Sequence, residues 1–166
     1  MQIPPELTAQ IDEAISHYPV SKRSASLPLL HLFQENFGYI SEEAIDWIAE
    51  KLELQPIHIL ELVTFYPMFR RKPPGKHHIR VCKTLSCALA GAEELKTKLC
   101  AATGIACDGH GGCHGDPVSV SADGRFSIES VECLASCGSG PVLMVNDDFF
   151  EAVTDAEIPT LLSQYK

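Results

Sequence analysis

Apolar residues recur at helical intervals through residues 1 to about 72. Leucine, isoleucine and phenylalanine stand three or four positions apart, which is the period of one face of an α-helix. Four segments show the pattern: Glu6 to His17, Ala25 to Phe37, a segment that Ser41 would cap, and a segment beginning near Pro56. The pattern predicts a small helical bundle, and the bundle shows no catalytic set of residues.

The fourth helical segment is expected to bury one face and to lead into an aromatic run. Ile57, Leu60, Val63 and Thr64 would point inward. The run that follows, 65–69 (Phe-Tyr-Pro-Met-Phe), is interpreted as core rather than as a binding surface, with a docking role as the alternative.

A change of pattern follows the segment 70–76, whose two prolines and one glycine mark a linker. We interpret it as a solvated linker, and its basic residues make a contact with an acidic partner the alternative. Beyond it, short apolar runs alternate with turns and one helical stretch. The expected strands are 77–82, about 126–132, 142–146 and 149–152, and the expected helices are about 88–102 and a final one to Tyr165.

A β-α-β unit followed by a β-hairpin and a helix is the layout of a thioredoxin-like fold. The sequence therefore predicts an α/β protein of two domains. Residues 1–75 would be the helical bundle with its basic linker, and residues 76–166 the thioredoxin-like domain.

Composition narrows the possible partners. The chain has 166 residues, of which 45% are hydrophobic, so it can build a core. Lys and Arg total 13 against 22 Asp and Glu, a net charge of −9. This acidity argues against nucleic acid or an anionic membrane as a partner and suits docking on another protein. Without a secretory signal or a membrane-spanning run, we expect a reducing cytoplasm and thiols free for metal.

Four cysteines lie in two short loops, and each loop follows a predicted strand. Cys82 and Cys87 form a C-x4-C pair, and Cys133 and Cys137 form a C-x3-C pair. Two parallel strands ending side by side would bring all four thiols to one edge of the sheet. Four thiolates are what a 2Fe-2S cluster needs.

The spacing favours iron–sulfur over two other kinds of site. Zinc sites mostly use C-x2-C pairs, whereas the wider C-x4-C loop is similar to the loop of plant-type ferredoxins. A thiol–disulfide enzyme is poorly supported because the chain has no C-x2-C pair. A zinc-stabilised interaction module stays open as the alternative, and four unligated thiols are disfavoured by the polar loops around them.

A helix is expected to begin directly after Cys87. Its buried face would carry Leu89, Ala92, Leu95 and Leu99. Glu94 and Lys98 would form an i,i+4 pair, and Gly104 would end the helix. The positive end of its dipole would then point at the anionic cluster.

The segment Cys107–Gly115 carries two cysteines and two histidines among four glycines. We interpret it as a quiet loop, because glycines do not preform a site, and a second metal site is the alternative.

Several runs carry a family likeness that covers nearly the whole chain. They are Gly38–Ser41, Glu61–Tyr66, Gly75–Cys82, Asp123–Phe126, Val131–Cys137 and Pro141–Asn146. With the four-cysteine pattern, they resemble the small thioredoxin-like iron–sulfur subunit of bacterial NADH:quinone oxidoreductase, respiratory complex I.

The resemblance implies an electron-transfer subunit. Cys82, Cys87, Cys133 and Cys137 would bind one 2Fe-2S cluster, and the chain would dock on a larger flavin- and NADH-binding subunit. FMN and NADH would reside on that partner, since no G-x-G-x-x-G opens a helix in this chain. The implied location is cytoplasmic, in the peripheral arm of a membrane-bound complex, without direct membrane insertion.

Two points qualify the likeness. The same subunit type also occurs in NAD-linked hydrogenases and formate dehydrogenases, so the parent complex stays open. The stretch between Cys87 and Cys133 is longer than the family norm, which makes Cys107 and Cys113 extra candidate ligands.

Overall fold

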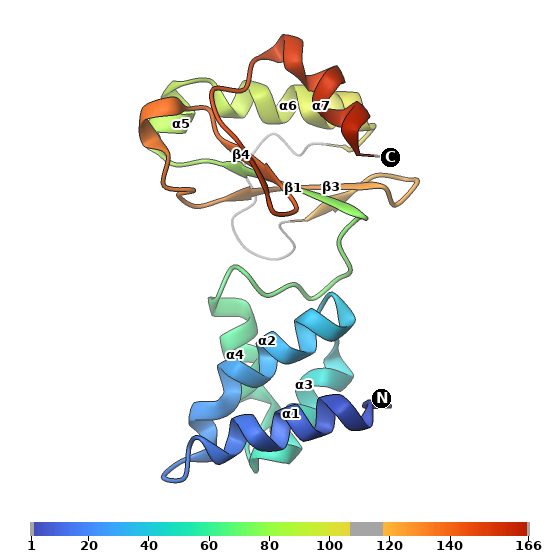
Figure 1. Ribbon diagram of the computed structural model, residues 1–166, viewed down its shortest axis with the longest axis vertical. Coiled ribbons are helices and arrows are strands. Elements are labelled where there is room, and N and C mark those ends of the chain that lie inside the picture. The colour runs from blue at the N-terminus through green and yellow to red at the C-terminus, as the bar shows by residue number, and fades with distance from the viewer. Residues whose placement is uncertain (1, 107–117, 166) are drawn as a thin grey trace. The chain divides into compact units, whose positions relative to one another are not determined.

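The computed structural model describes residues 2–106 and 118–165, which form two compact units, Met1–Pro73 and Pro74–Lys166 (Figure 1). The first unit is helical. Its elements are α1 (Pro5–Ser16), a 3-10 turn η1 (Lys22–Ala25), α2 (Ser26–Phe37), α3 (Glu42–Leu52) and α4 (Pro56–Phe65). The sequence-predicted bundle is therefore confirmed, and its core includes Leu7, Ile11, Leu30, Phe33, Ile48 and Ile59.

Helix α3 begins where the sequence predicts. Ser41 is extended, and its hydroxyl accepts a hydrogen bond from the N–H of Ala44 at 3.2 Å. In α4, however, Ile57 and Thr64 face solvent, while Ile59 and Val63 are buried. The sequence analysis was therefore wrong to place Ile57 and Thr64 on the buried face of this helix.

The aromatic run after α4 divides between core and surface. Phe69 is buried, but Phe65 is 76% exposed and Met68 is half-exposed. Interpreting the whole run as core was therefore wrong for its first aromatic residue. In addition, the start of the basic segment is attached to the bundle, because the N–H of Ile40 donates to the carbonyl of Arg70 at 2.7 Å.

The second unit is built on a five-stranded sheet of order β2-β3-β1-β4-β5. The strands are β1 (His77–Cys82), β2 (Ser119–Val120), β3 (Phe126–Val131), β4 (Leu143–Val145) and β5 (Asp148–Phe150). β1 and β3 pair in parallel, and the other pairings are antiparallel. The short edge strand β2 escaped the sequence analysis because two residues show no alternation.

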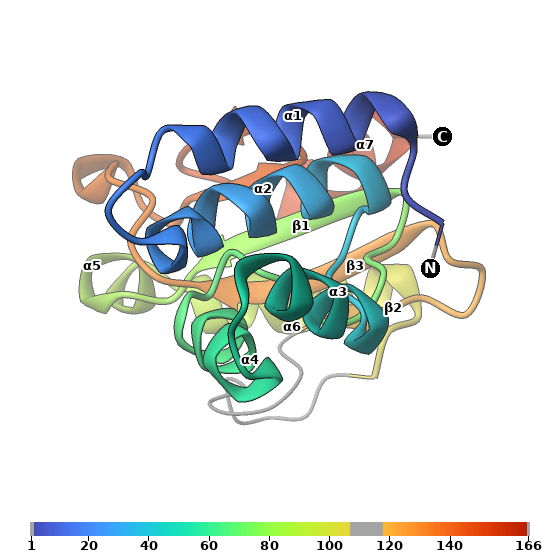
Figure 2. The ribbon, with the colours of Figure 1, turned by 90° about the horizontal axis from the view of Figure 1, so that it is seen from below.

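Helices cover one face of this sheet (Figures 1 and 2). They are α6 (Ala92–Thr103) and α7 (Ile158–Gln164), and the short elements are α5 (Leu85–Leu89), η2 (Cys137–Ser139) and η3 (Asp155–Glu157). Alternate residues of the central strands, among them Ile79, Val81 and Ile128, join Leu95 and Leu99 of α6 in the core. This packing fixes the ends of β1 and β3, where the cysteine loops begin.

The helix expected directly after Cys87 differs from the observed one. Gly91, with φ of 95°, separates α5 from α6, so Cys87 lies inside α5 and the long helix begins only at Ala92. Leu89 is consequently exposed, and Lys98 pairs with Asp155 rather than with Glu94. Gly104 does end α6 in the left-handed conformation, as predicted.

Gly75 belongs to the second unit rather than to a solvated linker. It is buried, and a Cβ placed on it would lie 2.5 Å from the carbonyl carbon of Phe126. Only glycine allows this approach to the first residue of β3.

Candidate metal centre

The four cysteines of the two loops meet at one end of the central strands. Cys82 is the last residue of β1 and is paired in register with Val131, the last residue of β3, so Cys133 follows two residues beyond the same edge. Cys87 lies in α5 and Cys137 begins η2. The parallel pairing expected from the sequence therefore brings the two loops together.

The first pair of thiols is buried. Cys82 and Cys87 are each only 2% exposed. Burial pushes the pKa of Cys82 upward, but hydrogen bonds from the Thr84 hydroxyl and from the backbone of Leu134 outweigh it, and the pKa ends below its usual value. Burial, together with the neighbouring Cys82 sulfur, raises the pKa of Cys87.

The second pair is open to solvent. The Sγ atoms of Cys133 and Cys137 lie 3.9 Å apart, and both side chains are exposed. The N–H of Ala135, a residue with φ of 63°, donates to the Cys133 sulfur at 3.2 Å. The Cys133 sulfur raises the pKa of Cys137, because two thiolates this close repel each other.

The two loops contact each other through Gly140. A Cβ at this position would lie 3.2 Å from the Cβ of Ala90 and 3.5 Å from the Cys87 sulfur. The peptide bond between Gly140 and Pro141 is cis. Cys137 also raises the pKa of Cys87 electrostatically, which shows that the two pairs share one local environment.

The donor set suits a 2Fe-2S cluster. Two sulfurs bound to one tetrahedral metal at about 2.3 Å lie about 3.8 Å apart, close to the separation of Cys133 and Cys137. A two-iron cluster takes two thiolates on each iron, and this site offers its thiolates as two pairs. Within residues 2–106 and 118–165, no three His, Cys, Asp or Glu side chains are grouped to hold a single metal ion.

Two further predictions from the sequence concern the helix dipole at Cys87 and the segment Cys107–Gly115. The dipole of the long helix does not begin at Cys87, because α6 begins beyond Gly91. The segment Cys107–Gly115, with the extra candidates Cys107 and Cys113, lies outside the described residues.

Sequence analysis missed one residue that supports the second loop. The carboxylate of Glu151 accepts hydrogen bonds from the hydroxyls of Ser136 and Ser139, which stand on either side of Cys137 along the chain. Glu151 lies twelve or more positions further along, and no local pattern indicates such a contact.

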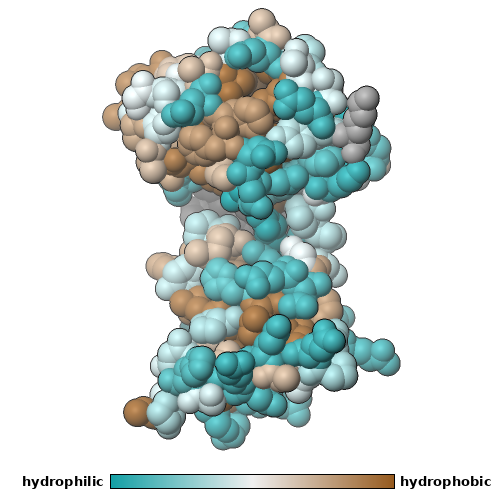
Figure 3. Space-filling model, viewed as in Figure 1, coloured by the Kyte–Doolittle hydropathy of each residue, from teal (hydrophilic) through white to brown (hydrophobic). Residues whose placement is uncertain are grey.

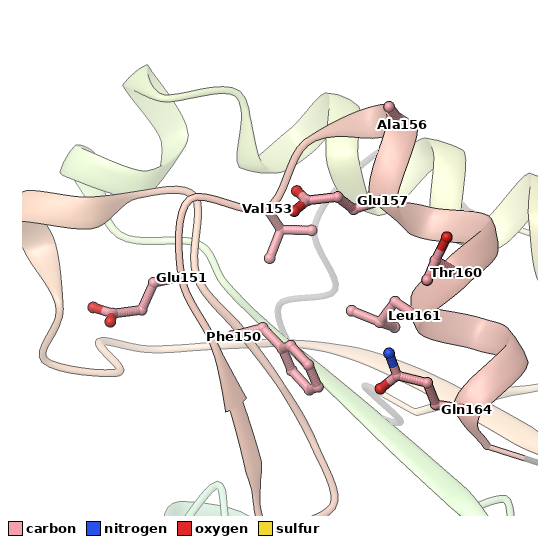
Figure 4. Close-up of a pocket in the computed structure, with 8 residues that line it drawn as sticks. All are labelled: Phe150, Glu151, Val153, Ala156, Glu157, Thr160, Leu161 and Gln164. Atoms are coloured by element: carbon pink, nitrogen blue, oxygen red, sulfur yellow. The ribbon is translucent and has the colours of Figure 1, made fainter.

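A hollow of about 300 Å³ lies between β5 and α7 (Figure 4). Its lining is mostly apolar and contains no cysteine. The residues are Phe150, Glu151, Val153, Ala156, Glu157, Thr160, Leu161 and Gln164.

Comparisons with known proteins show which family the chain resembles. The family model for the thioredoxin-like [2Fe-2S] ferredoxin matches residues 11–166. NADH-quinone oxidoreductase subunit 2 of Thermus thermophilus is 39% identical over 155 residues, covering 92% of this chain and 80% of that protein. An NADH-quinone oxidoreductase subunit of Aquifex aeolicus is 37% identical over 164 residues, covering 99% of this chain and 96% of that protein.

Solved structures show the same fold. A chain of an NAD+-reducing [NiFe]-hydrogenase in the H2-reduced state superposes with a TM-score of 0.63 at 22% identity, over 84% of this chain. This chain spans only 22% of that hydrogenase chain, so the likeness concerns the fold alone. The match across residues 11–166 and the two relatives show that the chain belongs to the thioredoxin-like [2Fe-2S] ferredoxin family.

Proposed function

We propose that this chain is the electron-transfer subunit of an NADH:quinone oxidoreductase, with one 2Fe-2S cluster on Cys82, Cys87, Cys133 and Cys137. The observation that carries the proposal is the meeting of two cysteine pairs at one end of β1 and β3. The names of the relatives support the parent complex.

The chain's own residues would prepare the site in three ways. β1 and α5 bury the first pair, which limits the access of water to one side of the site. The N–H of Ala135 donates to a sulfur and so stabilises its negative charge. Gly140 allows the second loop to close on Cys87. When bound, a 2Fe-2S cluster accepts and gives up one electron.

The partner would be the flavin- and NADH-binding subunit of the complex. Cys133 and Cys137 are exposed in the chain alone, and so are the apolar side chains of Leu85 and Leu89 on α5. Figure 3 shows an apolar area on this unit, on the side where α5 and β4 lie in Figure 1. We infer that FMN and NADH reside on the partner and that electrons pass between its flavin and this chain.

The proposed location is cytoplasmic, in the peripheral arm of a membrane-bound complex. The described part of the chain contains no helix with the length and apolar character needed to cross a bilayer. The structural neighbour from an NAD+-reducing hydrogenase supports a second candidate, the corresponding subunit of an NAD-linked hydrogenase. A formate dehydrogenase subunit is a related alternative.

Spectroscopy of the purified full chain tests the cofactor. We expect a brown protein with two irons and two sulfides per chain and a rhombic electron paramagnetic resonance signal after dithionite reduction. A colourless protein that contains zinc would instead identify an interaction module. Co-purification with a flavoprotein that oxidises NADH, or with a hydrogenase, would distinguish the two parent complexes.

A further inference from the structure

A single carboxylate connects the second cysteine loop to the segment that follows β5. The hydroxyls of Ser136 and Ser139 both donate to Oε1 of Glu151, and the two hydroxyl oxygens lie 2.7 Å apart. An ionised carboxylate can only accept hydrogen bonds, and each serine has one hydroxyl proton to give. Both protons are therefore used within this triangle of Ser136, Ser139 and Glu151.

Backbone hydrogen bonds join the same two segments. The N–H of Ala152 donates to the carbonyl of Ser139 at 2.7 Å, and the N–H of Val153 donates to that of Pro141 at 3.2 Å. Within the loop, the N–H of Ser139 donates to the carbonyl of Ser136 at 3.2 Å. The contacts of Glu151 with Ser136 and Ser139, which we call the Glu151 clamp, add a charged group to these backbone hydrogen bonds.

Glu151 borders the neighbouring hollow, but its carboxylate is not directed into it. Figure 4 shows the Glu151 carboxylate directed away from Phe150 and Leu161, which face the hollow. The two serine hydroxyls lower the pKa of Glu151, which keeps its carboxylate ionised at neutral pH. Hydrogen bonds to an ionised group contribute more than neutral ones, so this contact can hold a loop that is otherwise open to solvent.

We propose that Glu151 is a positioning residue for Cys137: it clamps the loop through Ser136 and Ser139, the residues on either side of Cys137, and places a negative charge beside it. The inference rests on the proposed function and deepens it, because it concerns the reduction potential of the same site. A negative charge near the cluster opposes the gain of an electron. The Glu151 carboxylate therefore holds the potential low.

Two variants and a matched control separate these effects. Glu151→Gln keeps an oxygen acceptor and removes the charge, whereas Glu151→Ala also releases both hydroxyls. Glu93→Gln removes an equal charge from an exposed position in the first turn of α6, outside the contacts of Glu151 with Ser136 and Ser139. Glu151 is itself exposed, so neither substitution empties a core position.

The first readout is amide hydrogen exchange of the full chain. In Glu151→Ala, the amides of Ser139, Ala152 and Val153 should exchange about tenfold faster or more, since a charge-assisted hydrogen bond is lost. Glu151→Gln should lie between Ala and wild type, and Glu93→Gln should match wild type.

The second readout is the midpoint potential in a titration followed by electron paramagnetic resonance. The potential should rise in both Glu151→Gln and Glu151→Ala, because both remove the charge, with only a smaller shift in Glu93→Gln. Exchange rates in Glu151→Ala within twofold of wild type, or a potential shift no larger than that of Glu93→Gln, would overturn the inference. A wild-type chain that takes up no iron on anaerobic reconstitution would overturn the proposed function itself, and this role of Glu151 with it.

Discussion

The two cysteine pairs of this protein have the same proposed task in opposite surroundings. Cys82 and Cys87 are buried on regular elements, a central strand and a short helix. Cys133 and Cys137 are exposed on the loop after β3, whose only regular element is the short 3-10 turn η2. One pair is placed by the hydrophobic core, and the other is placed by a few polar contacts.

This difference teaches where a site can be adjusted. Core packing fixes the first pair, so changes near it alter folding and ligand geometry together. The second pair depends on Gly140, on the N–H of Ala135 and on the Glu151 clamp, which can change without emptying the core. An exposed pair also leaves one side of the site available to a partner.

The largest expected effect is that of losing a ligand, and iron retention should fall equally whether the lost cysteine belongs to the buried or the exposed pair. Cys82→Ser and Cys133→Ser should each lower iron retention more than about 100-fold, because changing even a neighbour of a metal ligand costs about 10–100-fold. Iron per chain after anaerobic reconstitution and gel filtration measures this.

Cys113→Ser is the matched control for that experiment. It removes a cysteine of the same chain that is outside the proposed ligand set. Retention of the cluster in this variant is expected. Loss of iron in Cys113→Ser, with retention in Cys133→Ser, would assign the ligands differently.

Alkylation of the metal-free chain should show that the two cysteine pairs differ in their accessibility to solvent. Cys133 and Cys137 are exposed, so iodoacetamide should modify them at least about tenfold faster than Cys82 and Cys87, which react only after local opening. The lowered pKa of Cys82 favours its thiolate, but burial limits access and should dominate. Peptide mass spectrometry over time gives the order, and equal rates for both pairs would contradict the burial argument.

Crowding the contact between the loops should have a moderate effect. Gly140→Ala places a Cβ 3.2 Å from that of Ala90, and relief of this contact should cost about 1 kcal/mol of stability. Gly138→Ala is the control, because a Cβ there has no neighbour within 4 Å. Denaturant unfolding should separate the two variants, and equal stabilities would show that the loops adapt freely.

The sequence predicted the strands that carry the two cysteine pairs better than the contacts around either pair. Periodicity located β1, β3 and the hairpin, because buried and exposed positions recur at regular intervals along a strand or a helix. It did not predict the break at Gly91 or the exposure of Leu89, since the helical interval continues across the interruption. It also missed Glu151, whose partners are set by tertiary contacts between segments twelve or more residues apart.

The smallest expected effect concerns the support behind the second pair. Tyr165, which follows α7, donates its hydroxyl proton to Asp148 of β5 at 2.7 Å, and β5 leads directly to Glu151. Burial, with help from the Asp148 carboxylate, raises the pKa of Tyr165 to about 12. The ordinary tyrosine pKa of the unfolded chain is about 10, so this contribution is complete below about pH 10.

As the pH rises from about 10 to about 12, the unfolded state loses its tyrosine proton first, and the contribution of Tyr165 to stability is lost. Tyr165→Phe should therefore be less stable than wild type at pH 8, by less than about 1 kcal/mol because the side chain is only partly buried. The two proteins should converge near pH 12 in denaturant unfolding followed by circular dichroism. A stability difference that stayed constant from pH 8 to pH 12 would show that ring packing rather than the bond to Asp148 holds β5. The second pair would then depend on packing in the same way as the first.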